Sequence, residues 1–120
     1  MPSEKLIELA KLSQKITDLL KLSVSECTVF RSKGLLAHLL KRKHYTAAKY
    51  LDFLSDIIQK PDYAGFSAGT IELVKCFKDN IFISISLDVS KGIYYVSTMY
   101  DISSSKLEKY CTSGRLLKVD

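Results

Sequence analysis

The sequence predicts an α+β fold in which N-terminal helices pack on a small antiparallel sheet of three or four strands. Before Pro61, apolar residues recur at intervals of three and four, the spacing of amphipathic helices. After Gly65, apolar and polar residues alternate, the pattern of half-buried strands. The 120 residues are enough for one domain. We expect a single domain over 1–120, with a helical part over 3–60, a sheet over 70–101 and a short helix over 103–111.

Three helices are expected in the first half of the chain. The first begins after Ser3, a candidate N-cap, and its apolar residues are Leu6, Leu9, Leu12, Ile16 and Leu19. A short β-prone run over 27–30 leads to a second helix over 35–43. The expected apolar face of this second helix is Leu35, Leu36, Leu39 and Leu40. A third helix over 46–59 ends before Pro61, because the residue that precedes a proline avoids the α region.

Three strands are expected after the helices, over 70–77, 81–88 and 93–101. The breaks between them are short enough for hairpins, so neighbouring strands should pair antiparallel as a meander. In the last strand, alternation places Tyr94, Val96, Thr98 and Tyr100 on one face and Tyr95, Ser97 and Met99 on the other. A one-residue slip of register would present Ser97 in place of Thr98.

Composition excludes several classes of protein. The chain is 47% hydrophobic and 26% charged, which is typical of a globular protein and not of a disordered one. It has neither a membrane-spanning run nor a signal-peptide pattern, so we expect a cytoplasmic protein without a membrane partner. The three cysteines form no CxxC pair, and neither they nor the two histidines have zinc-site spacing. We therefore expect free thiols and no metal.

The net charge of +5 is concentrated in the first half of the chain. Residues 1–60 carry 11 Lys or Arg and 6 Asp or Glu, whereas residues 61–120 carry 7 of each. No acid lies between Glu26 and Asp52, and this stretch contains Arg31, Lys33, Lys41, Arg42, Lys43 and Lys49. Such a cluster favours a polyanion such as nucleic acid, although a solvated helix surface has the same composition. The expected nucleic-acid contacts are Lys41, Arg42, Lys43 and Lys49.

His44 is the first candidate for chemistry, because it lies between a basic run and a helix start and can transfer a proton near neutral pH. The alternative is an exposed loop histidine without a role. His38 lies between leucines, so we expect it to be structural. Hydroxyls of the last strand, such as those of Thr98 and Tyr100, suit phosphate oxygens, but these residues are also good strand formers. Lys75 is either a phosphate-binding cation or a lysine that reaches water.

Other catalytic classes lack their motifs. The chain has no glycine-rich nucleotide loop, no GxSxG, no HExxH and no identifiable carboxylate pair, so no cofactor is expected. One general base, several cations and several hydroxyls remain. These are the ingredients of metal-free RNA cleavage, in which the neighbouring 2′-hydroxyl is the nucleophile.

Several short segments carry a resemblance to a known family. They are 38–44, 50–51 and 57–63, the last ending in Pro61-Asp62-Tyr63, followed in the same order by 72–75, 83–85 and 95–100. Over about residues 27–110 the chain resembles the phage-associated branch of the Barnase/EndoU/colicin/RelE-like (BECR) nuclease superfamily. The resemblance implies helices against an antiparallel sheet. It also implies an endoribonuclease-like toxin or effector that acts on RNA without a metal, and hence a neutralising protein partner.

By position, the resemblance implies that His44 is a general base or acid, Lys75 the phosphate-binding cation, and Thr98 and Tyr100 hydroxyl donors, with Arg42 assisting. Tyr45 departs from the family pattern, in which proline often follows the histidine. Without a second histidine as partner acid, Tyr100 or Lys75 would protonate the leaving oxygen. The alternative functions are a non-catalytic module that binds nucleic acid or protein, and a winged-helix DNA-binding domain.

Overall fold

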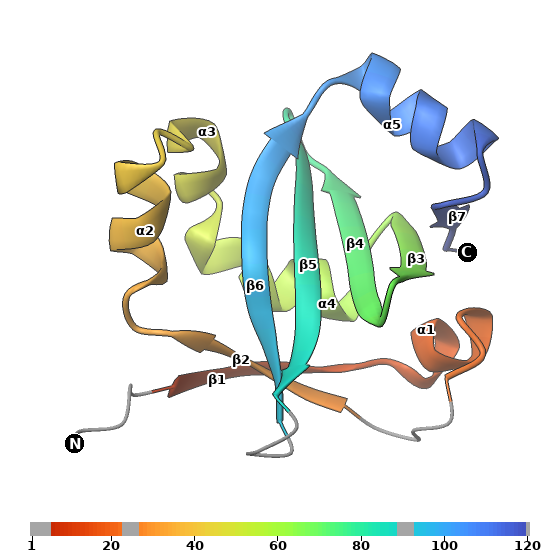
Figure 1. Cartoon of the computed structure of the whole chain (residues 1–120), viewed down its shortest axis with the longest axis horizontal. Helices are drawn as coiled ribbons and strands as arrows, with labels where there is room; N and C mark the ends of the chain where they lie inside the picture. Colours follow the sequence, from red (N-terminus) through yellow and green to blue (C-terminus); the bar gives the residue numbers. More distant parts are fainter. Residues whose placement is uncertain (1–5, 23–26, 89–92, 120) are drawn as a thin grey trace.

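The computed structural model describes residues 6–22, 27–88 and 93–119. Its centre is a seven-stranded mixed sheet with the strand order β1-β2-β6-β5-β4-β3-β7 (Figure 1). The strands are β1 (Leu6–Leu12), β2 (Cys27–Ser32), β3 (Tyr63–Ser67), β4 (Thr70–Cys76), β5 (Asn80–Asp88), β6 (Ile93–Ile102) and β7 (Leu117–Lys118). The expectation of helices packed on three or four strands is therefore wrong, because segments assigned to helices or loops add strands at both sides of the meander.

The helices are short, and none in the described ranges is long and apolar enough to cross a membrane. They are α1 (Gln14–Leu19), α2 (Leu35–Lys41), α3 (Tyr45–Ala48), the 3₁₀ turn η1 (Leu51–Phe53), α4 (Leu54–Gln59) and α5 (Ser104–Thr112). The second expected helix and the terminal helix are present, with small changes at their ends. Ser103 caps α5, and its Oγ accepts a hydrogen bond from the Lys106 N–H at 3.1 Å.

The predicted meander is confirmed, since β4, β5 and β6 pair antiparallel in chain order. β3 extends it on one side through a tight turn in which Ala68 and Gly69 have left-handed φ angles of 52° and 78°. β7 then pairs with β3 and forms the outer edge. β3 was not expected, because its residues follow directly on the Pro61-Asp62 break, whose composition is that of a loop.

The first expected helix is wrong over most of its length. Residues 6–12 form β1, paired antiparallel with β2, and the helix α1 begins only after its N-cap Ser13. A bulge between Glu8 and Ala10 interrupts the alternation of β1, which leaves apolar residues at helix-like intervals. Pairing with the distant β2 overrides this local preference. The candidate N-cap Ser3 lies outside the described residues.

The expected helix over 46–59 is broken into α3, η1 and α4. Its predicted core residues Ala47, Leu54, Ile57 and Ile58 are buried. The break gives Tyr50 a different orientation from a regular helix. Its ring stacks on Phe77 at 4.7 Å between centroids, and its hydroxyl donates to Asp79 Oδ2 at 2.9 Å. These contacts with the β4–β5 connection account for the loss of one continuous helix.

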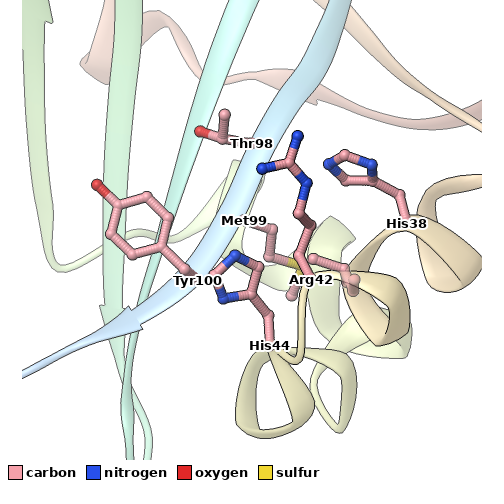
Figure 2. A pocket seen from close by; sticks show the side chains of 7 residues that line it. His38, Arg42, His44, Thr98, Met99 and Tyr100 are labelled. Carbon is pink, nitrogen blue, oxygen red and sulfur yellow. The ribbon is translucent and has the colours of Figure 1, made fainter.

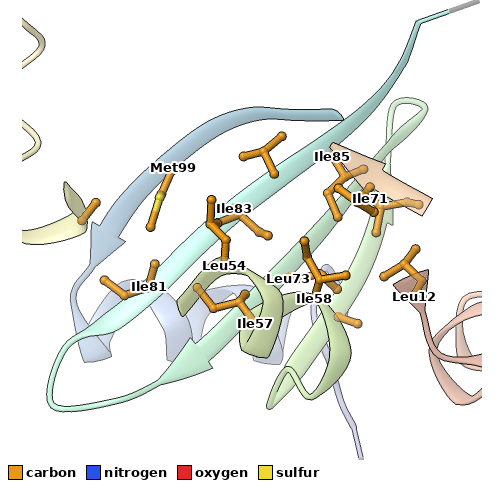
Figure 3. Close-up of a cluster of buried hydrophobic side chains, with 14 of the residues drawn as sticks. Leu12, Leu54, Ile57, Ile58, Ile71, Leu73, Ile81, Ile83, Ile85 and Met99 are labelled. Carbon is orange, nitrogen blue, oxygen red and sulfur yellow. The ribbon is translucent and has the colours of Figure 1, made fainter. Parts of the chain in front are cut away.

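Both faces of the sheet are covered in part. On one face, Leu54, Ile57 and Ile58 of α4 pack on the central strands (Figure 3). The strand residues of this cluster include Ile71, Leu73, Ile81, Ile83, Ile85 and Met99. On the other face, Val74 and Phe82 lie in a smaller cluster with Leu107 of α5. We call these the α4 face and the α5 face of the sheet.

The position of β2 decides where α2 and α3 lie. β2 runs parallel to β6 and pairs with it at two positions, Val29 with Tyr94 and Phe30 with Tyr95. Farther along β6, α2 and α3 lie beside the strand in place of a neighbouring strand (Figure 1). The second half of β6 therefore faces helical residues, and this is where the candidate site forms.

Candidate functional site

An open pocket of about 430 Å³ lies between the α2–α3 segment and β6 (Figure 2). The residues that line it are His38, Leu39, Arg42, His44, Thr98, Met99 and Tyr100. They come from two segments far apart in the sequence. Four residues singled out by the sequence analysis, Arg42, His44, Thr98 and Tyr100, thus come together in one pocket.

His44 is positioned by the turn that ends α2. The Lys43 N–H donates to the Leu40 carbonyl at 3.1 Å, and the His44 N–H donates to the Leu39 carbonyl at 2.8 Å. Lys43 itself has a left-handed φ of 61°. This combination is a Schellman motif, in which the left-handed residue is usually glycine. The turn brings His44, which is half-buried, against the side chain of Tyr100.

The rings of His44 and Tyr100 are neighbours, with 6.2 Å between their centroids and 35° between their planes. Tyr100 also stacks on the buried Phe82, at 4.9 Å and 30°. Burial raises the pKa of the Tyr100 hydroxyl above its ordinary value, Tyr110 acts in the same direction, and the cation of Lys106 opposes it. The hydroxyl therefore keeps its proton at neutral pH and is suited to donate it.

A bulge brings Thr98 to the pocket. Thr98 pairs with Ser84 and Val96 pairs with Ile85, so Ser97 is an extra residue in β6. Val96 is buried in the α4-face core, whereas Thr98 is exposed. The strict alternation expected for the last strand is therefore wrong at Val96, because the bulge shifts the register by one residue.

The same bulge distinguishes the two neighbouring hydroxyls. Ser97 Oγ lies 2.9 Å from Ser86 Oγ and donates to the Ser84 carbonyl at 3.2 Å. Its hydrogen-bonding capacity is thus used within the sheet. The Thr98 side chain instead lines the pocket, so Thr98 is the hydroxyl that a ligand reaches first.

Arg42 supplies the positive charge of the pocket. It is the C-cap of α2, and its guanidinium projects between His38 and Thr98 in the view of Figure 2. No carboxylate in the described parts of the chain pairs with it. Lys41, Lys43 and Lys49 are exposed on the same α2–α3 segment but do not line the pocket.

His38 was interpreted as structural from the sequence, yet it is exposed and lines the pocket. It precedes Arg42 by four residues on α2, so the two side chains share one helix face. This spacing of four residues is the feature of the sequence that could have placed His38 beside Arg42. The expected apolar face of the helix is also wrong in part: Leu36 and Leu40 are 42% and 45% exposed.

Lys75 lies elsewhere. Its Nζ donates to the Lys60 carbonyl at 2.8 Å and lies 5.9 Å from the centre of the Phe77 ring. Leu73, two residues earlier on β4, packs in the α4-face core, whereas Tyr100 packs on the α5 face. Lys75 therefore projects from the opposite face of the sheet, and the structure does not bring it into the pocket.

The pocket combines proton-transfer groups with one cation. Two imidazoles, a phenol, a hydroxyl and a guanidinium line it, and no carboxylate does. Within the described ranges, no three His, Cys, Asp or Glu side chains are grouped as metal ligands. Imidazole and phenol can exchange protons with a substrate, and guanidinium can neutralise a phosphate. The arrangement suits attack on a phosphodiester.

A family model described as phage-Barnase-EndoU-ColicinE5/D-RelE like nuclease3 matches residues 9–109. The chain belongs to this family. It is a nuclease-like domain of the BECR type, which confirms the resemblance seen in the sequence. No curated protein and no solved structure matches the chain.

The match to the BECR family runs from β1 into α5 and includes every residue that lines the pocket. Tyr110 and Arg115 lie beyond it. Arg115 Nε and Nη2 donate to the two carboxylate oxygens of the buried Glu72, at 2.8 and 2.6 Å, and the guanidinium lies 4.1 Å from the centre of the Tyr110 ring. These contacts thus bind the segment after residue 109 to the α5 face of the sheet, which also carries Tyr100.

Proposed function

We propose that this domain is an endoribonuclease that cleaves RNA at the His44 pocket by attack of the neighbouring 2′-hydroxyl, without a metal ion. The observation that carries the proposal is the pairing of the His44 and Tyr100 rings, 6.2 Å apart, in a pocket that Arg42 also lines. Membership of a nuclease family supports it. The phage association of the family makes a toxin or effector role our working hypothesis.

In the proposed reaction His44 is the general base. Neutral His44 takes the proton of the 2′-hydroxyl, and the 2′-oxygen attacks the adjacent phosphorus. The bond from phosphorus to the 5′-oxygen breaks, and the leaving 5′-oxygen receives a proton from the Tyr100 hydroxyl. The products are a 2′,3′-cyclic phosphate and a 5′-hydroxyl. Arg42 neutralises the charge that develops on the phosphoryl oxygens, and Thr98 donates a hydrogen bond to one of them.

His38 is the competing candidate for the acid. It lines the same pocket and brings the second imidazole that the sequence analysis did not find. We assign the acid to Tyr100 because its ring is a neighbour of His44, 6.2 Å away between centroids, and its hydroxyl carries a proton at neutral pH. Lys75, the other acid considered from the sequence, has its Nζ at the Lys60 carbonyl on the opposite face.

The test is incubation of the purified protein with total tRNA and with a synthetic single-stranded RNA in EDTA, followed by analysis of the fragment ends. We expect cyclic-phosphate ends from the wild-type protein. Loss of a general base costs about 10²- to 10⁴-fold, so His44→Ala should be slower by that factor. Lys78→Ala, an exposed cation outside the pocket and outside the basic stretch, is the matched control. Absence of cleavage at every protein concentration would overturn the proposal.

A second candidate function is binding without catalysis. Leu36 and Leu40 are exposed on α2, within the stretch of the chain that holds six cations and no acid. An apolar pair inside a basic surface suits an acidic protein, such as a neutralising partner, better than it suits RNA. On this alternative, charge reversal at Lys41 and Arg42 abolishes binding, whereas His44→Ala leaves binding unchanged.

A further inference from the structure

Lys106 is a cation beside Tyr100 that comes from α5 and not from the α2–α3 segment. It belongs to the first turn of α5, and its Nζ lies 5.6 Å from the centre of the Tyr100 ring and 5.7 Å from that of Tyr110. The ammonium is therefore held near two aromatic rings while the residue remains exposed to solvent. Tyr100 in turn touches His44, so one ring separates this cation from the proposed general base.

The charge of Lys106 is uncompensated. Across residues 6–22, 27–88 and 93–119, no carboxylate forms an ion pair with it. Two other cations near the sheet are already engaged: Arg115 with Glu72, and Lys75 with the Lys60 carbonyl. Lys106 is thus a cation beside Tyr100 that is open to a ligand, as is Arg42 in the pocket.

We propose that Lys106 binds the phosphate of RNA next to the one that is cleaved, so that the α5 edge of the site is a second phosphate subsite. The identity of the ligand rests on the proposed function. A polynucleotide carries one phosphate per nucleotide, so a strand whose scissile phosphate lies at His44 and Arg42 presents a neighbouring phosphate beside Tyr100. An exposed ammonium binds phosphate as a point charge.

The first experiment measures binding without cleavage. A short 2′-O-methyl oligonucleotide lacks the attacking hydroxyl, and its affinity is measured by fluorescence anisotropy at several salt concentrations. The slope of log K against log salt concentration is negative, and loss of one phosphate contact on a single strand reduces its magnitude by about 0.7. We expect this change for Lys106→Met, which keeps the apolar stem over the rings, and wild-type slopes for Lys106→Arg and for the matched control Lys109→Met.

Three outcomes would overturn the subsite. They are an unchanged slope for Lys106→Met, an equal change of slope for Lys109→Met, and no binding of the oligonucleotide by the wild-type protein. Lys106→Gln repeats the measurement if the methionine variant does not fold.

The second experiment compares cleavage of a dinucleotide, which has one phosphodiester, with that of a trinucleotide. Lys106→Met should lower kcat/KM several-fold for the trinucleotide only, and an equal loss on both substrates would contradict the subsite. Absence of all cleavage would refute the proposed function, while the anisotropy result would still decide the subsite.

Discussion

The imidazole of His44 lies against the phenol ring of Tyr100, with 6.2 Å between the ring centres. Both rings are held by other contacts within the protein. Two backbone hydrogen bonds at the end of α2 close the turn that holds His44, and the buried Phe82 stacks on Tyr100. The proposed base and acid are therefore positioned by contacts that do not involve the substrate, which favours proton transfer.

The first prediction concerns the Tyr100 hydroxyl. Tyr100→Phe removes the proposed acid but keeps the ring that stacks on Phe82, so the change in stability should stay below about 1 kcal/mol. Single-turnover cleavage should slow by about 10²-fold or more, the usual contribution of a general acid. Wild-type cleavage rates for this variant would assign the acid to another group, and His38→Ala would then be measured next.

The second prediction concerns pH. The pKa of Tyr100 is raised above its ordinary value of 10.0, so its protonated, active form persists to at least that pH. The rate should therefore not fall with rising pH until the pH exceeds about 10. The measurement is kcat as a function of pH. A rate that falls with rising pH well below 10 would assign the acid to a group other than Tyr100, and the profile of His38→Ala would then be measured.

The third prediction concerns the turn before His44. Lys43 adopts a left-handed conformation that costs a residue with a Cβ about 1 kcal/mol relative to glycine. Lys43→Gly should therefore raise the free energy of unfolding by up to about 1 kcal/mol, measured by urea denaturation. Lys43→Ala removes the charge but keeps the Cβ, so it should not stabilise the protein. Equal stabilisation by both variants would point to charge repulsion as the cause.

The fourth prediction concerns the ion pair of Glu72 and Arg115. The Glu72 side chain is 6% exposed and that of Arg115 37%. Arg115→Met leaves a buried carboxylate without its partner and should cost about 3 kcal/mol of stability, the lower end for a broken buried pair. Glu72→Leu in the Arg115→Met background removes the unpaired charge and should restore part of the loss. If the double variant is less stable than Arg115→Met alone, unpaired charge is not the cause.

Local patterns in the sequence predicted the parts of the fold whose partners are near in the chain. The strands β4, β5 and β6 alternate in polarity and are joined by short connections, so their antiparallel order follows from the sequence. The helices α2 and α5 could also be predicted from contiguous residues, and the family resemblance rests on short segments of the same kind. His44 and Arg42 were identifiable because a histidine after a basic run is visible without knowledge of the fold.

The remaining features depend on contacts between distant segments. β1 is a strand because β2 pairs with it, and no local pattern distinguishes that outcome from a helix once a bulge has broken the alternation. The bulge at Ser97 likewise exists only where β6 meets β5, and it decides that Thr98 lines the pocket.

Local patterns along the chain were sufficient to predict the meander, the family and the chemical groups available for catalysis. Which of those groups meet depends on the folded arrangement, which brings His38 into the pocket and leaves Lys75 on the opposite face of the sheet. The spacing of apolar residues along a helix or strand specifies the face on which each side chain lies. The neighbour that such a face meets is chosen by strand pairing across the whole chain.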